Sequence, residues 1–292
     1  MLIVVGVLVV LGLLGGFLWL RSVWNRIDRV EVSHVLSSGG EGTNYLIVGS
    51  DARPEGEEGP AGQRSDTIML LHLEGDESLI MSIPRDLYVE IPSRGGSSKI
   101  NAAYNDGPAA LVETVTQTLR IPVHRYMEVD FVSFGGLVDG LGGVTVTFDN
   151  PAYDERSGLF VPEAGAVELD GEQALAYVRS RRYTEVIDGT ERTDPRGDLG
   201  RVERQQEFLT AVASKLGNTR NPLALARAGS GAAGGLRIDD AMSMLDGLRF
   251  VWAMRGLDPE QVELPVDSGN NESGSVLFLR ESEASAVLDR VR

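Results

Sequence analysis

The fold is decided by the stretch Asn44-Tyr45-Leu46-Ile47-Val48-Gly49-Ser50-Asp51, a compact apolar run that ends in small and polar residues. Such a run predicts a buried β-strand that delivers a loop at its end. Residues 67–73 and 79–83 repeat the pattern, and residues 54–62, which are rich in Gly, Pro and Glu, predict a loop. Polar residues should therefore gather where neighbouring strands end.

The predicted strands alternate with amphipathic helices. Pro108 begins a helix that stops before Pro122, and residues 125–130, 131–141 and 144–148 predict a strand, a helix and a strand. Further helices are expected at residues 171–178, 199–216 and 239–255, with a strand at residues 262–266. Asp198 is the expected N-cap of the second of these helices, and Ser282 caps a final one. This order predicts an α/β fold in which strands and helices form layers.

The N-terminal residues 2–20 form an unbroken apolar run. As a helix they would span roughly 28 Å, close to the hydrocarbon thickness of a bilayer, so residues 1–20 predict a transmembrane anchor. A cleaved signal peptide is the alternative, but the run is long and lacks a clear cleavage site. Residues 21–42 then form a connector that carries Arg21, Arg26 and Arg29. Taken alone, the positive-inside rule would place the rest of the chain in the cytoplasm.

The cations of the chain are few and unevenly distributed. The formal net charge is −16 over 292 residues, and the only lysines are Lys99 and Lys215. The arginines gather in residues 63–66, 83–86, 179–182 and 198–205. Guanidinium groups bind phosphate in a bidentate manner, whereas nucleic-acid proteins usually carry a broad basic face. The sequence therefore predicts a pocket for a small, highly charged anion.

Other chemistries are excluded by the residues present. The chain contains no cysteine, and its three histidines are isolated from one another, so thiol chemistry and a zinc site are not expected. The glycines between residues 135 and 143 form no dinucleotide or P-loop fingerprint, and we expect them to allow close packing and turns.

Two aspartates are candidates for a metal site. Asp51 and Asp66 are expected at the ends of neighbouring strands, where their carboxylates could together hold Mg²⁺. The alternative is that both simply form turns, as acidic residues after strands often do.

The arginines are the candidates for anion binding. Arg201 and Gln205 lie on one face of the expected helix, together with Arg204. Arg179 and Arg181 would alternate on one side of an extended segment, with Arg182 on the other. For any single arginine a solvated or salt-bridged role is the more common one, but their joint concentration favours an anion site.

These segments resemble, in order, the signature motifs of the LytR-CpsA-Psr family. The matching segments are residues 44–53 (NYLIVGSDAR), 64–67 (RSDT), 82–86 (SIPRD), 99–104 (KINAAY), 174–181 (ALAYVRSR) and 198–205 (DLGRVERQ). Six motifs in the same order are specific, and they cover about residues 43–217.

The resemblance implies a domain over residues 43–292 with α/β/α layers around a central mixed sheet. Its motifs would lie in the core at residues 43–217, with the C-terminal helices packed on that core. It implies a phosphotransferase, anchored by one transmembrane helix, that attaches glycopolymers from polyprenyl-pyrophosphate-linked precursors to peptidoglycan through a phosphodiester. Because the acceptor lies outside the cytoplasm, the domain would lie there too, despite the arginines after the anchor.

The resemblance also implies roles for individual residues. Asp51, Asp66 and Arg85 would form the catalytic centre, and Asp51 and Asp66 would hold Mg²⁺ or Mn²⁺. The pyrophosphate would be bound by Arg53, Arg64, Arg85, Arg179, Arg181, Arg201 and Gln205. The polar stretch at residues 183–197 is longer than the family pattern, and we expect it to form a mobile flap beside the site. The expected partners are the lipid-linked glycopolymer, peptidoglycan and the membrane, with no nucleic acid.

Two alternatives use the same residues. A Mg²⁺-dependent phosphatase or pyrophosphatase acting on polyprenyl pyrophosphates would let water attack instead of a sugar hydroxyl. A non-catalytic envelope regulator is the second alternative, although no helix-turn-helix signal is present and the charge is negative.

Overall fold

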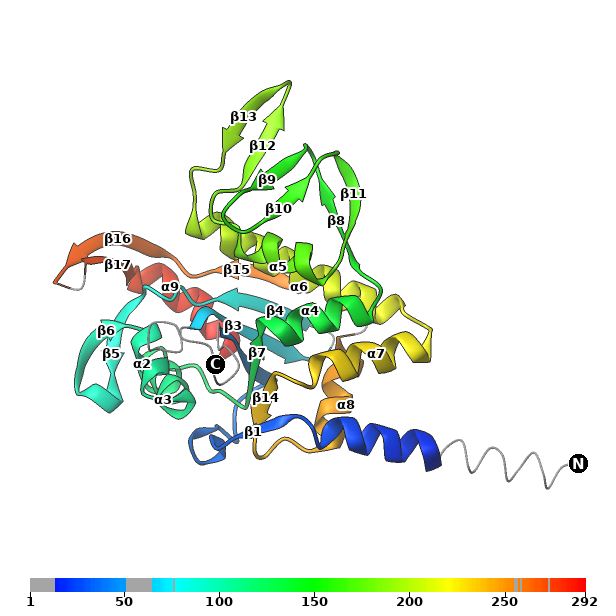
Figure 1. The fold of residues 1–292 in the computed structure, drawn as a ribbon. Helices are drawn as coiled ribbons and strands as arrows, with labels where there is room; N and C mark the ends of the chain where they lie inside the picture. Colours follow the sequence, from blue (N-terminus) through cyan, green and yellow to red (C-terminus); the bar gives the residue numbers. More distant parts are fainter. Residues whose placement is uncertain (1–13, 51–64, 76, 255–256, 258, 273) are drawn as a thin grey trace, which may run out of the picture.

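The computed structural model describes residues 14–50, 65–75, 77–254, 257, 259–272 and 274–292 (Figure 1). Its centre is a seven-stranded sheet in the order β1-β14-β7-β2-β3-β4-β15. The strands are β1 (Asp28–Val30), β14 (Leu236–Asp239), β7 (Arg125–Asp130), β2 (Thr43–Ser50), β3 (Ser65–Glu74), β4 (Glu77–Ser82) and β15 (Glu260–Glu263). β2 pairs with β7 in parallel and with β3 antiparallel. The predicted α/β fold with a central mixed sheet is confirmed.

The side chains of β2 alternate between two cores, one on each face of the sheet. Leu46 and Val48 are fully buried in a core that also contains residues of α3 (Pro108–Thr118) and α9 (Glu281–Leu288). Tyr45 and Ile47 point to the other face, where α6 (Asp198–Asn218) and α8 (Met244–Ala253) contribute to the packing. This alternation follows from the two-residue period of a strand. Helices therefore cover the sheet on both faces.

A second group of elements packs beside the sheet around a third core. It contains α4 (Phe131–Gly140), α5 (Gly171–Arg179), α6 and α7 (Pro222–Ala232), with the strands β8 (Val144–Phe148), β9 (Ala152–Asp154), β10 (Leu159–Val161) and β11 (Gly165–Leu169). The backbones of α4 and α7 approach so closely that a Cβ on Gly140 would come within 2.4 Å of the Ala228 backbone. The expectation that these glycines allow close packing is confirmed.

Residues 183–197 include a β-hairpin of β12 (Thr184–Ile187) and β13 (Thr190–Thr193), which projects from the molecule (Figure 1). The remaining described elements are β5 (Tyr88–Ile91), β6 (Gly96–Lys99), α2 (Asn101–Asn105), β16 (Val266–Asn271), β17 (Gly274–Leu279) and three short 3₁₀ turns. They lie around the α3 and α9 side of the sheet.

Some expected boundaries were wrong. Helix α6 begins at Asp198 and its N-cap is Gly197, whose φ of 54° suits glycine, so Asp198 is not the cap. Helix α9 is capped by Arg280 rather than Ser282. Arg179 is the last residue of α5 and not part of an extended segment. Only from Ser180 on is the chain extended, which matters for the arginines that follow.

Residues 14–24 are helical, and residues 1–13 lie outside the described part of the chain. Within the described residues, no helix combines the length and the apolar character that crossing a membrane requires. Most of the expected anchor at residues 1–20 therefore falls on residues that the structure does not describe.

Candidate functional site

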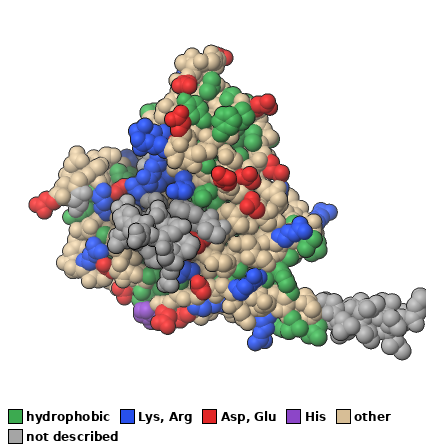
Figure 2. All heavy atoms as spheres, viewed as in Figure 1, with side chains coloured by type: hydrophobic (Ala, Val, Ile, Leu, Met, Phe, Trp, Pro, Cys, Tyr) green, Lys and Arg blue, Asp and Glu red, His purple; other side chains and the backbone are tan. Residues whose placement is uncertain are grey.

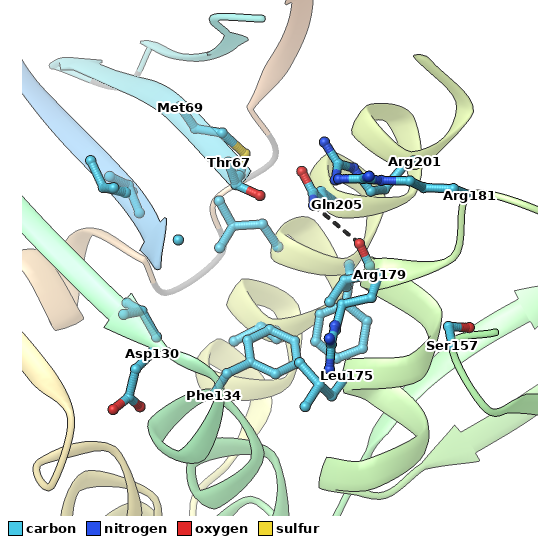
Figure 3. A pocket seen from close by; sticks show the side chains of 18 of the residues that line it. Thr67, Met69, Asp130, Phe134, Ser157, Leu175, Arg179, Arg181, Arg201 and Gln205 are labelled. Atoms are coloured by element: carbon cyan, nitrogen blue, oxygen red, sulfur yellow. Dashed lines mark hydrogen bonds between the residues drawn. The ribbon is translucent and has the colours of Figure 1, made fainter. Parts of the chain in front are cut away.

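A cavity of about 660 Å³ lies between the sheet and helices α4, α5 and α6 (Figure 3). The sheet contributes the ends of three neighbouring strands, β2, β3 and β7. Lining residues from these strands are Ile47, Val48, Gly49, Thr67, Met69, Val129 and Asp130. The cavity therefore opens at the strand ends where the sequence predicted polar residues to gather.

Arginines supply the polar part of the lining. Arg179 ends α5, Arg181 follows it, and Arg201 lies in the first turn of α6, where its side chain is 3% exposed. Figure 3 shows Arg181 and Arg201 close together beside Gln205, whose Nε2 donates to the Val178 carbonyl at 3.1 Å. Arg201 is buried, and a buried guanidinium favours an anion strongly because little water screens it, whereas Arg179 and Arg181 are exposed.

Apolar side chains supply the rest of the lining. From α4, α5 and α6 come Phe134, Leu137, Leu175, Val178, Phe208, Leu209 and Val212. Phe134 and Phe208 pack with their ring centroids 5.2 Å apart. A cavity with cations on one part of its wall and aliphatic and aromatic groups on another suits a ligand with an anionic head and an apolar tail.

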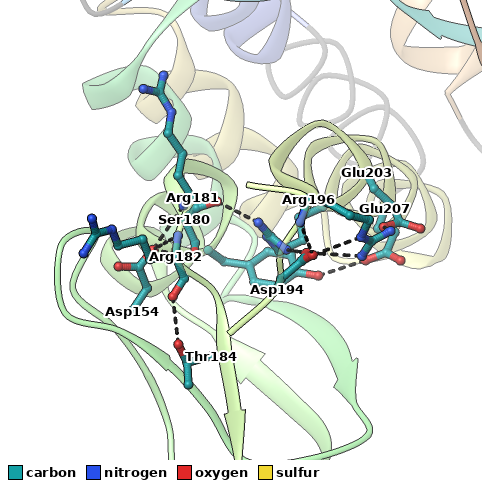
Figure 4. Close-up of polar contacts among 11 residues, drawn as sticks. Asp154, Ser180, Arg181, Arg182, Thr184, Asp194, Arg196, Glu203 and Glu207 are labelled. Atoms are coloured by element: carbon teal, nitrogen blue, oxygen red, sulfur yellow. Dashed lines mark hydrogen bonds and ion pairs between the residues drawn. The ribbon is translucent and has the colours of Figure 1, made fainter. Parts of the chain in front are cut away.

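One buried carboxylate, Asp154, fixes the chain that carries these arginines (Figure 4). Its Oδ2 accepts hydrogen bonds from Ser180 Oγ at 2.7 Å and from the backbone N–H groups of Arg181 and Arg182 at 3.1 and 2.8 Å. Its Oδ1 accepts from the N–H of Arg156 at 2.9 Å. Burial alone would raise the pKa of Asp154, but these hydrogen bonds outweigh burial and lower it.

Arg204 fastens the same segment to α6. Its Nη2 donates to the Ser180 carbonyl at 2.8 Å, its Nη1 lies 3.3 Å from Asp194 Oδ2, and its guanidinium stacks over the Tyr183 ring at 4.7 Å. Arg204 therefore faces the hairpin connection and has a structural role, although it shares a helix turn with Arg201. The ion pair between Arg204 and Asp194 connects residues 183–197 to α6.

Of the two predicted aspartates, only Asp66 falls within the part of the chain that the structure describes. Asp51 is outside the described residues, and Asp66 lies in β3, although its side chain is not described. Ser65 pairs with Ser50 and Thr67 with Gly49, so Asp66 is the extra residue of a β-bulge. Bulges often re-aim a residue beside an active site. Among the side chains that the structure describes, no group of three or more metal-binding residues occurs.

The other predicted residues are spread differently. Arg53 and Arg64 lie outside the described residues. Arg85 is not among the residues that line the cavity; its Nε lies 3.4 Å from Asp86, which also pairs with Lys99 at 2.8 Å. Burial would raise the pKa of Asp86, but the hydrogen bond from Lys99 and the Arg85 charge lower it.

Two arginines of the cavity were missed from the sequence. Arg156 lies in the turn between β9 and β10. The sequence pattern that could have predicted this turn is Asp154-x-x-x-Gly158, which is typical of a turn closed by an aspartate. Arg182 was not among the predicted anion-binding residues. Both line the cavity, because the chain turns around Asp154 there.

Comparison with known proteins gives consistent matches. The model of the LytR_cpsA_psr family matches residues 23–284. The chain is 33% identical over 290 residues to the probable cell wall biosynthesis protein LcpB of Corynebacterium glutamicum, covering 94% of this chain and 66% of that protein. It is 36% identical over 197 residues to the polyisoprenyl-teichoic acid–peptidoglycan teichoic acid transferase TagU of Oceanobacillus iheyensis, covering 64% of this chain and 56% of that protein. The chain thus spans less than two thirds of these relatives.

Solved structures match over most of their length. The LytR-Csp2A-Psr enzyme from Actinomyces oris gives a TM-score of 0.74 at 25% identity, covering 91% of this chain and 96% of that one. TagT bound to LI-WTA gives a TM-score of 0.68 at 26% identity, covering 91% of this chain and 96% of that one.

Proposed function

This chain belongs to the LytR_cpsA_psr family, and we propose that it is a phosphotransferase that attaches a glycopolymer to peptidoglycan, with a polyprenyl-pyrophosphate-linked glycopolymer as donor. The names of its relatives support the reaction class, since TagU is a polyisoprenyl-teichoic acid–peptidoglycan teichoic acid transferase. The lining of the cavity supports a polyprenyl-pyrophosphate-linked donor and phosphoryl transfer.

The observation that carries the proposal is the divided lining of the cavity. Arg156, Arg179, Arg181, Arg182 and Arg201 line the same cavity as the apolar side chains of α4, α5 and α6. A polyprenyl pyrophosphate has the matching form, a compact anion on an apolar chain. A pyrophosphate needs several charge-assisted contacts, which guanidinium groups provide in pairs.

The reaction needs positioning and charge stabilisation more than covalent chemistry. The acceptor hydroxyl oxygen forms a bond to the phosphorus next to the glycopolymer, and the bond from that phosphorus to the bridging oxygen breaks. Polyprenyl phosphate leaves with the negative charge, which the arginines stabilise, and the hydroxyl proton passes to a carboxylate. Asp51 and Asp66 are our candidates for that carboxylate, and Arg85 is a candidate for binding from the same edge.

We further propose that Asp51 and Asp66 hold Mg²⁺ or Mn²⁺. Their oxygen donors are of the kind these ions prefer. β2 ends at Ser50, directly before Asp51, and Ser50 pairs with Ser65, directly before Asp66. This end of the two strands lies beside the cavity-lining residues Gly49 and Thr67, which supports the proposal. The ion would neutralise phosphate charge.

The location follows from the substrates. The acceptor and the lipid carrier meet at the outer surface of the cytoplasmic membrane, so we propose that residues 1–20 anchor the chain there as a single span with the domain outside. The apolar sequence of these residues supports this.

Transfer can be tested with the purified full chain, a lipid-linked glycopolymer and peptidoglycan fragments. Wild type should form the acceptor-linked product and release polyprenyl phosphate, and Arg201→Ala should slow transfer. Arg290→Ala is the matched control, since Arg290 pairs with Glu260 on the surface, away from the cavity lining. Hydrolysis of the donor at the same rate without acceptor, with no linked product, would favour the phosphatase and contradict transfer.

A further inference from the structure

The outward face of α8 carries large apolar side chains. Leu245, Leu248 and Trp252 are spaced i, i+3 and i+7, so they form one stripe, and they are 60%, 43% and 70% exposed. We call these three residues the α8 stripe. The opposite face of α8 is packed, since Phe250 contacts Tyr45 with ring centroids 4.8 Å apart. The core therefore holds α8 in place while a second apolar face points outward.

Helix α8 lies beside the helix at residues 14–24 (Figure 1). Trp24 packs directly on α8, because a Cβ on Gly247 would come within 2.4 Å of the Trp24 ring. That helix itself exposes Leu14, Phe17 and Leu18. The sequence before it, MLIVVGVLVVLGL at residues 1–13, contains no charged residue. α8 thus packs against the last residue of a helix that leads back into the most apolar segment of the chain.

Exposed cations border these apolar residues. Arg21 and Arg26 are exposed, and the side chain of Arg249 on α8 is 77% exposed. Arg29 lies over the Trp24 ring at 4.6 Å. Figure 2 shows basic and hydrophobic side chains side by side on this part of the surface. In a chain of net charge −16, this local group of arginines suits anionic lipid head groups.

We propose that the α8 stripe docks on a lipid bilayer that contains anionic lipids, with α8 lying in the head-group region. Interfacial helices combine an apolar face with neighbouring basic residues, and tryptophan is enriched at that depth. The apolar sequence to which the neighbouring helix leads and the bordering arginines favour a lipid surface over a protein partner. The inference rests on the membrane location proposed above and is independent of the transfer reaction.

Docking would also orient the cavity. Helices α6 and α8 pack on the same face of the sheet, and Ile47 on that face both contacts their core and lines the cavity. A bilayer that holds α8 therefore lies on the side of the sheet that carries the cavity. A lipid-linked donor could then enter with its tail still near the membrane.

The chain lacks cysteine, so single cysteines can be labelled specifically. Leu248→Cys and Trp252→Cys would each carry an environment-sensitive fluorophore in the full chain, reconstituted in vesicles of phosphatidylcholine and phosphatidylglycerol. We expect both labels to be quenched by doxyl lipids and protected from aqueous iodide. Phe160→Cys is the matched control, because Phe160 is an apolar residue on β10 that is 68% exposed. Its label should respond to iodide and not to doxyl lipids.

Labels at 248 and 252 that behave like the control would overturn the inference. Protection from iodide without quenching by doxyl lipids would mean that protein covers the stripe, and it would overturn the inference too. Transfer measured in the same vesicles separates the two proposals. An active enzyme whose labels stay outside the bilayer contradicts docking alone, whereas an inactive chain with labels in the bilayer supports docking and contradicts the proposed function.

Discussion

Replacing Asp154 by Asn tests whether one carboxylate positions the arginines of the cavity. Its Oδ2 accepts from Ser180, Arg181 and Arg182, and its Oδ1 accepts from the N–H of Arg156. The asparagine side chain has one acceptor oxygen and one NH₂ group. If its oxygen takes the place of Oδ2, its NH₂ group takes the place of Oδ1 and faces the Arg156 N–H, which then has no acceptor there. A hydrogen bond to a charged group contributes about 1.5–3 kcal/mol, so the free energy of unfolding should fall by about that amount.

The effect should depend on pH with a definite sign. Burial would raise the pKa of Asp154, but the hydrogen bonds lower it below its ordinary value. A carboxylate with a lowered folded-state pKa stabilises the protein above the unfolded-state pKa, about 4, and loses this contribution as pH falls through the folded-state value. The difference between wild type and Asp154→Asn should therefore be largest near neutral pH and shrink in acid.

Urea denaturation followed by circular dichroism measures this difference. Glu155→Gln is the matched control, since Glu155 is the exposed neighbour of Asp154 and should change stability little. Because the arginines would lose their support, binding of farnesyl pyrophosphate should weaken as well. A free energy of unfolding within about 0.5 kcal/mol of wild type, with normal binding, would refute the role given to Asp154.

Other predictions concern the reaction and its location. Asp66→Asn and excess EDTA should each remove most transfer activity, and full activity with EDTA would contradict the metal proposal. Arg179→Ala combined with Arg201→Ala should cost less than the sum of the single losses, because both cations act on one anion, whereas strictly additive losses would indicate separate sites. Arg201→Lys should restore little, since an ammonium lacks the planar fork, and wild-type rates in that variant would count against bidentate binding. A reporter fused after Arg292 should be active only outside the cytoplasm, and a cytoplasmic signal would overturn the proposed location.

The central strands could be predicted because their apolar runs are long and bounded by turn residues. Which strands lie side by side could not, because β14 and β15 come from the last quarter of the chain and join the sheet beside β7 and β4. Such pairings connect residues far apart in sequence and leave no local signal. The helix boundaries that were wrong depended on single backbone angles, as at Gly197.

The residues of the cavity also divide into those that the local sequence predicts and those that depend on distant contacts. Arg201 and Gln205 were grouped from helical spacing, which is a local property, and the structure brings them into one cavity with Arg179. The positions of Arg156 and Arg182 depend on hydrogen bonds from their backbone N–H groups to Asp154, which lies 2 residues before Arg156 and 28 residues before Arg182. Both arginines line the cavity, and neither was among the predicted anion-binding residues, because contacts of this kind leave no local signal in the sequence.

The most direct test of the central claim is the affinity of the purified full chain for farnesyl pyrophosphate, measured by titration calorimetry against farnesol. If the arginine-lined cavity binds a lipid pyrophosphate, wild type should bind the pyrophosphate and not the alcohol. Arg201→Ala should weaken binding by about ten- to a hundredfold, and Arg290→Ala should not change it. Equal affinity of wild type and Arg201→Ala for the pyrophosphate, or equal binding of farnesol, would contradict the account.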